Sequence, residues 1–312
     1  MNRVLTERET RQFAEDGYVV LEHGVPVPLI EELDTLFWSH VRAIEPRMPW
    51  QRPLYHLQEG IAGGPFEAAF TARVTSAVND LLGPGRWQPI DWLGWWVVTY
   101  PGWDPPPWRP PALGWHVDGL YELAEPRAAR GLPDAVRVSG RRRRPPEFRY
   151  RLNGREQGLV LIFLISDMLP GSGTAIVPAS HRLACRHLRA AGAAGLSPME
   201  LQARLTDNPR PDGLPSPTAL ERLLLDLQLK RPIAGGHRGV LPPALQEQAV
   251  EVTGVRGDVL LLHPLILHAT SSNTTDRPRI IANPWIELRA DARLDIDRSH
   301  ATPYELSLTD GW

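Results

Sequence analysis

The chain has 312 residues, a formal net charge of −2 and a sequence pI of about 6.6. Proteins that bind nucleic acid or anionic membranes usually carry a net basic excess, so this balance argues against both kinds of partner and favours a small-molecule substrate. One elaborated β-barrel or sandwich can reach this length, and we expect a single domain over residues 1–312. Composition leaves the oligomeric state open.

The cysteine content and the N-terminal segment both indicate the cellular compartment in which the protein works. Cys185 is the only cysteine, so the chain can form neither an intrachain disulfide nor a cysteine-based zinc or iron–sulfur site. The first 20 residues carry charge throughout, without the apolar core of a secretory signal. No run reaches the roughly 18 consecutive apolar residues of a membrane span. We therefore expect a cytoplasmic protein.

The N-terminal segment predicts a helix, a strand and a second helix. Thr6 stands three residues before Glu9, the spacing of a capping box, which predicts a helix over 5–16. The β-branched and aromatic run at 18–21 predicts a strand, and apolar residues at helical spacing predict a helix over 26–41.

Strand-like runs dominate the middle and the end of the chain. An aromatic, β-rich run at 86–100 precedes a proline-rich loop at 101–114. The apolar run at 157–169 ends in a Pro-Gly-Ser-Gly turn, and we expect residues 174–178 to return as the second strand of a buried hairpin. Further strand-like runs occupy 248–252, 259–263 and 279–282.

Two segments interrupt these strands. Residues 186–248 are Ala- and Leu-rich, with helical stretches at 199–205 and 218–229, and predict a helical insertion or lid. Residues 124–156 form a Pro/Arg-rich segment whose Arg141–Arg144 run we interpret as a solvated loop, not a phosphate site. The predicted fold is mainly β, with an antiparallel double-sheet core and helical buttresses.

The sequence Gly114-Trp115-His116-Val117-Asp118-Gly119 contains a candidate metal site. Alternate residues of a strand share a face, so His116 and Asp118 can bind one ion while Val117 points away. These are two-thirds of the 2-His-1-carboxylate triad that leaves iron positions open for co-substrate and oxygen. An HxD pair alone is a weak indication, because a histidine satisfied in the core or at the surface is commoner.

A third ligand must come from elsewhere in the chain. His263 and His268 both lie in GDVLLLHPLILHATSSNTTDRPRI, and Arg279 follows His268 by eleven residues at the start of an apolar strand. A planar guanidinium can bind a carboxylate through two parallel hydrogen bonds, and an unpaired charge would be costly to bury there. The pattern therefore predicts an arginine that anchors a carboxylate.

Taken together, three motifs resemble one known family. They are HVDG at 116–119, Asp167 followed by GSGTAIVPASHR, and GDVLLLHPLILHATSSNTTDRPR at 257–279. The set is similar to the phytanoyl-CoA dioxygenase family of Fe(II)/2-oxoglutarate-dependent oxygenases, and the opening LTERETRQFAEDGYVVLEHGV extends the resemblance to about residues 5–288. The resemblance implies a double-stranded β-helix core, the jelly-roll or cupin-like fold. It also implies Fe(II), 2-oxoglutarate and O2 as metal, co-substrate and oxidant.

The resemblance also assigns roles to individual residues. It implies that His116, Asp118 and His268 bind iron, which leaves His263 in the supporting wall. Arg279 would bind the distal carboxylate of 2-oxoglutarate, with help from Thr270. The family usually has Asn-Gly where this chain has Ser172-Gly173, a departure that touches no catalytic residue. Related halogenases lack the carboxylate, so Asp118 favours hydroxylation over halogenation.

Several residues and alternatives remain open. Trp115 is a candidate substrate wall and equally a candidate core residue, whereas we expect His181, in the PASHR turn, to have a structural role. His56 and Cys185 lie in no recognisable motif. A non-redox metal-binding jelly roll, such as an isomerase or an inactive binding module, is the competing class, and the presence of Arg279 argues against it.

Composition and the helical insertion favour one class of substrate. Lys230 is the only lysine beside many arginines, which suggests GC-rich bacterial coding. Together with the atypical 186–248 insertion, this favours an enzyme that hydroxylates a small molecule in secondary-metabolite tailoring. An acyl-CoA hydroxylase is the alternative within the same enzyme class.

Overall fold

A computed structural model describes the following residues: 3–44, 52–57, 60–118, 121–123, 127–128, 132–134, 136–139, 141–143, 147–152, 154, 158–207, 217–230, 239–289 and 301–309. The expected single domain over 1–312 includes residues outside these ranges and stays a prediction. Among the described residues, no helix is both long enough and apolar enough to cross a membrane.

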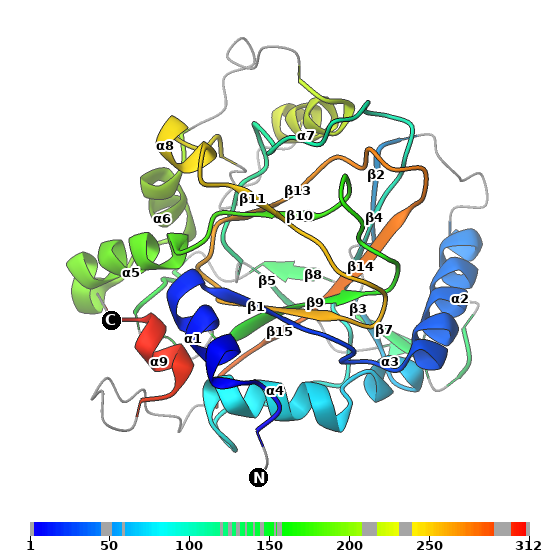
Figure 1. Ribbon diagram of the computed structural model, residues 1–312, viewed down its shortest axis with the longest axis horizontal. Helices are drawn as coiled ribbons and strands as arrows, with labels where there is room; N and C mark the ends of the chain where they lie inside the picture. Colours follow the sequence, from blue (N-terminus) through cyan, green and yellow to red (C-terminus); the bar gives the residue numbers. More distant parts are fainter. Residues whose placement is uncertain are drawn as a thin grey trace.

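Two antiparallel sheets form the centre of the molecule (Figure 1). The larger has the order β1-β12-β9-β14-β4-β2, with β15 also paired to β9, and the smaller has the order β11-β10-β13. Strands of the larger sheet are β1 (Tyr18–Leu21), β2 (Leu54–Leu57), β4 (Trp95–Thr99), β9 (Leu159–Leu164), β12 (Val259–Leu262), β14 (Arg279–Asn283) and β15 (Trp285–Ile286). Those of the smaller are β10 (Thr174–Ile176), β11 (Val250–Val252) and β13 (His268–Thr270).

The chain alternates between the two sheets as it runs from β9 to β14. It passes from β9 to β10 and β11, returns to β12, crosses again to β13 and ends in β14. The segment before β9 follows the same rule, because β4 belongs to the larger sheet and His116 extends the smaller one through a bridge to His268. This is the connectivity of a double-stranded β-helix, so the predicted jelly-roll, cupin-like fold is confirmed.

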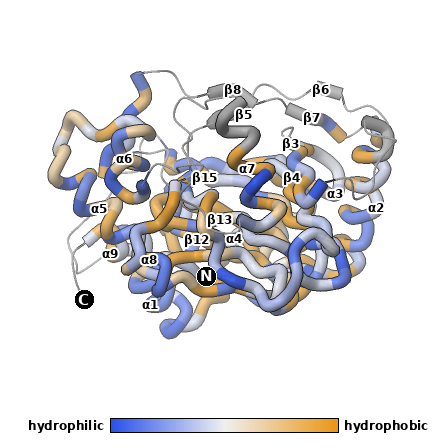
Figure 2. Tube along the Cα trace, turned by 90° about the horizontal axis from the view of Figure 1, so that it is seen from above, coloured by the Kyte–Doolittle hydropathy of each residue, from blue (hydrophilic) through white to orange (hydrophobic). Residues whose placement is uncertain are grey.

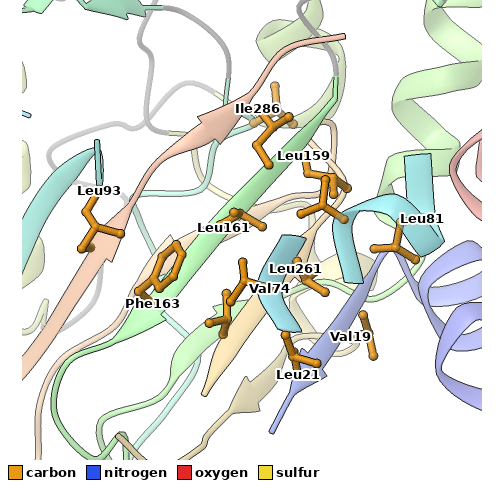
Figure 3. Packing of buried hydrophobic residues seen from close by; sticks show 14 of the residues in the cluster. Val19, Leu21, Val74, Leu81, Leu93, Leu159, Leu161, Phe163, Leu261 and Ile286 are labelled. Carbon is orange, nitrogen blue, oxygen red and sulfur yellow. The ribbon is translucent and has the colours of Figure 1, made fainter. Parts of the chain in front are cut away.

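Each strand of the larger sheet contributes side chains to two separate apolar layers, as strand alternation requires. The outward face packs beneath the N-terminal helices (Figure 3). Figure 3 shows Leu161 and Phe163 of β9, Leu261 of β12 and Val74 of α4 (Ala72–Leu82) in this layer. The inward face faces the smaller sheet, and its apolar residues, among them Ile162, Leu164, Leu260 and Ile281, form a distinct cluster with Ile176. Because this inward face is mostly apolar, a polar side chain buried on it is a candidate functional residue.

Helices buttress the outside of the sheets (Figure 1). α1 (Glu7–Asp16) begins with the predicted capping box, in which Thr6 and Glu9 bond reciprocally, and ends at Gly17. Figure 2 shows more orange along the central strands β12 and β13 than along the outer helices α1 and α5 (Ser180–Ala191), as expected for amphipathic surface helices. The other helices on this side are α2 (Val27–Ile44), α3 (Pro65–Ala68), α4 (Ala72–Leu82) and α9 (Pro303–Ser307).

The region predicted as a helical insertion is mainly helical where it is described, with isolated β-bridges at Leu196, Asp207, Gly239 and Val240. It contains the end of α5 (Ser180–Ala191), a 3-10 turn (Gly192–Ala194), α6 (Pro198–Leu205), α7 (Ala219–Lys230) and α8 (Pro243–Gln246). The 124–156 segment, expected as a loop, contains β6 (Arg127–Ala128), β7 (Arg137–Ser139) and β8 (Arg141–Arg143). β7 pairs with β6 and β3 (Gly60–Ala62), and β8 pairs with β5 (Tyr121–Leu123). Three residues of the arginine run are thus in a strand, and Arg144 lies outside the described residues.

Two local predictions were wrong. β9 and β10 do not form a hairpin, because β9 pairs with β12, β14 and β15 while β10 pairs with β11 and β13. The turn at 170–173 therefore carries the chain from one sheet to the other. His181 does not lie in a turn but in the first turn of α5, where its side chain is fully buried.

Candidate metal and co-substrate site

The backbone places the two metal-binding segments side by side. His116 and His268 exchange backbone hydrogen bonds, each N–H donating to the other's carbonyl at 3.1 Å, so they form an antiparallel bridge. Gly114 precedes this segment with φ +109°, a conformation that glycine adopts without strain as the chain leaves the proline-rich loop. Residues far apart in sequence are thus fixed as direct neighbours.

The side chains of His116, Asp118 and His268 converge. Nδ1 of His116 lies 2.8 Å from the Gly114 carbonyl, and Nδ1 of His268 lies 3.1 Å from the Ile266 carbonyl. A carbonyl only accepts, so each Nδ1 carries the proton and donates, and each Nε2 keeps its lone pair for a metal. Oδ1 of Asp118 lies 3.8 Å from Nε2 of His116, and its Oδ2 lies 3.4 Å from Nε2 of His268.

These separations suit one metal ion. Two atoms that each lie roughly 2.1 Å from the same ion can be at most roughly 4.2 Å apart, and both carboxylate–imidazole separations are shorter than that. The candidate ligand atoms of all three residues lie within 4.8 Å of one another. Among the described residues, no other group of three or more His, Cys, Asp or Glu side chains is this compact. Two nitrogens and one oxygen are the donor set of a facial iron triad.

Two side chains outside the motifs hold the HxD segment in place. The buried Tyr150 donates its hydroxyl to the Asp118 carbonyl at 2.8 Å, and Nε2 of Gln202 in α6 donates to the Trp115 carbonyl at 3.0 Å. They therefore brace the backbone on both sides of His116. Neither residue belongs to a local sequence pattern, so sequence reasoning did not select them.

Arg279 lies at the inward start of β14 and is 1% exposed. Its Nη1 donates to the carbonyls of Ser172 and Gly173 at 3.0 and 2.9 Å. Its Nε and Nη2 are buried and have no hydrogen-bond partner among the described residues. Burial lowers the Arg279 pKa to about 10, with Glu251 acting in the opposite direction, so the guanidinium is charged at neutral pH. One edge of a buried cation is thus available to an anion.

Further residues shape the surroundings of Arg279. Thr99 lies directly opposite it on β4, and the Thr99 hydroxyl is buried without a partner among the described residues. Oε1 of Glu251 accepts from the backbone N–H groups of Gly171 and Gly173 at 2.8 and 2.7 Å, and so fixes the turn that offers carbonyls to Arg279. Thr270 shares a face of β13 with His268, on the strand that leads towards Arg279.

The structure separates the other candidates from this cluster. Trp115 is fully buried in the outward core, and its Nε1 donates to the Pro111 carbonyl at 2.7 Å, so it packs in the fold, and its role as a substrate wall stays a prediction. His263 is also fully buried, and its Nδ1 accepts from the Leu265 N–H at 3.1 Å. Its ring stacks on Tyr304 and lies 4.8 Å, between centroids, from that of His181.

Comparisons with known proteins point in the same direction. Residues 172–281, about a third of the chain, match the Phytanoyl-CoA dioxygenase (PhyH) family. The match contains His268, Thr270 and Arg279 and begins after His116 and Asp118. No curated protein matches the chain. The predicted family resemblance is confirmed over this segment, and with it the enzyme class: a non-haem iron oxygenase that uses 2-oxoglutarate and O2.

The chain is also similar to several solved structures. They include HygX from Streptomyces hygroscopicus with nickel and 2-oxoglutarate bound, at 15% identity over 91% of this chain and 87% of that chain, with a TM-score of 0.43. Another is EctD from S. alaskensis in its apoform, at 17% identity over 97% of this chain and 81% of that chain, with a TM-score of 0.46. A third is SnoK, a non-heme alpha ketoglutarate dependent carbocyclase from nogalamycin biosynthesis, at 14% identity over 93% of this chain and 87% of that chain, with a TM-score of 0.44.

Proposed function

We propose that this chain, whose residues 172–281 match the phytanoyl-CoA dioxygenase family, hydroxylates a small organic substrate at an iron centre formed by His116, Asp118 and His268. Arg279 binds the distal carboxylate of 2-oxoglutarate, and Thr270 assists from β13. When bound, iron and 2-oxoglutarate together supply the oxidising power for attack on a C–H bond, with O2 consumed and 2-oxoglutarate converted to succinate and carbon dioxide.

The observation that carries this proposal is the state of the Arg279 guanidinium. Its Nη1 is held by two carbonyls, while Nε and Nη2, buried and without partners among the described residues, form the edge that binds a carboxylate through two parallel bonds. A buried charge left in this state is costly unless an anion completes it. The Thr99 hydroxyl, buried in register opposite, can donate to the same carboxylate.

The remaining roles follow from the same contacts. Nε2 of each histidine presents a lone pair because Nδ1 is engaged with a carbonyl, and Asp118 balances part of the metal charge. Tyr150 and Gln202 keep the HxD segment in register with β13. Asp118 takes the position that halogenases leave for chloride, which supports hydroxylation.

Bacterial secondary-metabolite tailoring is the setting that we propose for this activity. Two features support it: the arginine-rich composition with Lys230 as the only lysine, and the helical insertion at 186–248, which contains none of the three motifs that carry the family resemblance. An acyl-CoA substrate would require a basic groove for its phosphates, and within the described ranges only the short strand at Arg141–Arg143 suggests one.

Release of carbon dioxide from 2-oxoglutarate labelled at C1 tests the proposal. We expect release that depends on Fe(II) and O2, and an Arg279→Lys variant that needs roughly tenfold or more 2-oxoglutarate for half-maximal release, because an ammonium cannot reproduce the guanidinium edge. Arg277→Lys is the matched control, since Arg277 is exposed. Protein that binds Fe(II) but releases no carbon dioxide would contradict the oxygenase assignment and favour a non-redox metal site.

A further inference from the structure

Three tryptophans gather on the inward face of the larger sheet. Trp95 of β4 faces inward with Val97 and Thr99, and Trp285 of β15 packs against the inward apolar cluster. Trp92 precedes β4, and its ring centroid lies 4.9 Å from that of Trp285 at an interplanar angle of 81°. The Trp95 and Trp285 rings are 5.3 Å apart at 65°. The indoles thus meet edge to face in one cluster.

The connections between the sheets place the tryptophan cluster and Arg279 at opposite ends of the strands, with the metal ligands between them. β13 runs towards the turn that leads into β14, so Thr270 and Arg279 lie near one end, and His268 lies further from that turn. β4 likewise ends at Thr99, opposite Arg279, whereas Trp95 begins the strand. Four residues along a strand span roughly 13 Å.

The metal ligands therefore stand between two different walls of one interior. The first wall is the Arg279 and Thr99 end, which suits the co-substrate carboxylate. The second is the Trp92, Trp95 and Trp285 cluster, which lies at the Asn283 end of β14. A substrate that meets the iron from the side opposite the Arg279 end would contact this aromatic wall.

The aromatic wall also carries polar atoms. Asn283 faces inward opposite Trp95, and its Oδ1 is buried without a hydrogen-bond partner among the described residues. His56 of β2 packs its ring edge-on to Trp95, at 6.0 Å between centroids. Trp92 and Trp285 remain partly exposed, whereas Trp95 is buried, so the wall has a surface that a ligand can reach.

A close backbone contact at Gly94 brings the parts of this wall together. Gly94 has φ +69°, and a Cβ at this position would collide with the backbone of Asn283 and Pro284. Only glycine allows the turn between Trp92 and Trp95 to approach β14 and β15 so closely. The side chains named in this wall include no carboxylate, and the adjacent Asp91 is engaged with Arg137 at 2.6 Å.

We propose that Trp92, Trp95 and Trp285, together with Asn283, form the substrate wall, and that the substrate is a neutral molecule with a planar ring and a hydrogen-bond donor. Indoles arranged edge to face offer large flat surfaces for ring stacking, and a single amide oxygen fixes the orientation of the ring. This inference rests on the proposed oxygenase function, because it takes the iron centre as the neighbour of the wall.

Equilibrium binding of 2-naphthol, measured by calorimetry, tests the wall. The protein is studied both as the anaerobic Fe(II)/2-oxoglutarate complex and without metal, with 2-methoxynaphthalene as the probe that lacks the donor and choline as a cationic probe. We expect Trp285→Ala to weaken 2-naphthol binding by roughly tenfold or more and Trp285→Phe to weaken it less. Asn283→Ala should remove the preference for 2-naphthol over 2-methoxynaphthalene.

Trp103→Ala is the matched control, because Trp103 lies in the proline-rich loop and is 38% exposed; its 2-naphthol binding should equal that of the wild type. Unchanged binding in Trp285→Ala, no 2-naphthol binding by the wild type, or tighter binding of choline than of 2-naphthol would each overturn the proposal. Binding to the metal-free protein separates the two hypotheses: if it persists and depends on Trp285 while no carbon dioxide is released from 2-oxoglutarate, the oxygenase function fails and the aromatic site stands.

Discussion

Among the described residues, two pairs of imidazole rings lie side by side, and only one of these pairs has surroundings that suit a metal. The His116 and His268 rings are 4.5 Å apart between centroids, and those of His181 and His263 are 4.8 Å apart. In the first pair, each Nδ1 lies against a carbonyl and each Nε2 lies within 4 Å of Asp118.

The second pair is enclosed by apolar and aromatic groups. Both rings are fully buried, and His263 packs between Tyr304 and Phe13. Burial lowers the pKa of His263 well below its ordinary value, and it lowers that of His181 to about 3, with Arg182 contributing. A histidine is therefore a candidate ligand where a carboxylate lies beside its Nε2 and a carbonyl engages its Nδ1, and proximity to another histidine is not sufficient.

Removal of the carboxylate should have the largest effect. We expect Asp118→Ala to lose roughly 100-fold or more of its Fe(II) affinity and its Fe(II)-dependent succinate formation, because metal-site substitutions even outside the ligands cost up to that much. Asp167→Ala is the control, since Asp167 is paired with Arg256. Metal affinity by anaerobic calorimetry and succinate formation provide the measurements, and an Asp118→Ala enzyme with wild-type affinity would remove the distinction between the two pairs.

His263→Ala should affect stability and leave the metal site intact. Loss of a fully buried ring stacked on Tyr304 creates a cavity, which we expect to cost about 3 kcal/mol in the free energy of unfolding. Urea denaturation of the metal-free protein measures this cost. If instead His263→Ala unfolds at the wild-type urea concentration but no longer binds Fe(II), the roles of the two histidine pairs have been assigned wrongly.

The buried pair of His181 and His263 should also make the stability of the protein depend on pH. His181 is neutral in the folded protein because its pKa is about 3, whereas in the unfolded chain it is protonated below about pH 6.5. The unfolded state therefore binds more protons, so stability is complete above pH 6.5 and falls as the pH drops towards 3, by up to about 1.4 kcal/mol per pH unit for one histidine. His181→Leu should flatten the dependence of the free energy of unfolding on pH in this range, and an unchanged slope would contradict the assignment.

The smallest expected effect concerns the support of the first pair. Tyr150→Phe removes the 2.8 Å hydrogen bond to the Asp118 carbonyl and should cost about 1 kcal/mol of stability. Fe(II) affinity should fall by roughly tenfold if this bond also orients Asp118. Tyr18→Phe is a suitable control, because Tyr18 lies on β1, at the far edge of the larger sheet. A change of stability without a change of affinity would limit Tyr150 to a structural role.

Local patterns predicted some of these features and missed others for identifiable reasons. Strand alternation brings His116 and Asp118 to one face, so the sequence alone predicted that these two residues lie together. The spacing typical of the family favoured His268 over His263 as the third ligand. Thr99 and Glu251 reach the Arg279 region only through the pairing of strands that are distant in sequence, which no local pattern encodes.

The same limit explains the fold predictions. The residues of β1, α1 and β12 were predictable because capping, β-branched content and apolar runs act locally. The predicted hairpin failed because an apolar run followed by a turn does not reveal whether the next strand pairs with it or crosses to the other sheet. α4 and α9 were not predicted, although Thr71 and Thr302 cap them.

We propose that His268, and not His263, binds iron beside 2-oxoglutarate. Anaerobic titration with Fe(II) and 2-oxoglutarate, followed by the visible charge-transfer band of the chelated co-substrate, tests it most directly. We expect the band in the wild type and in the folded fraction of His263→Ala, and its loss in His268→Ala. A wild type without the band, or a band that persists in His268→Ala, would contradict the account.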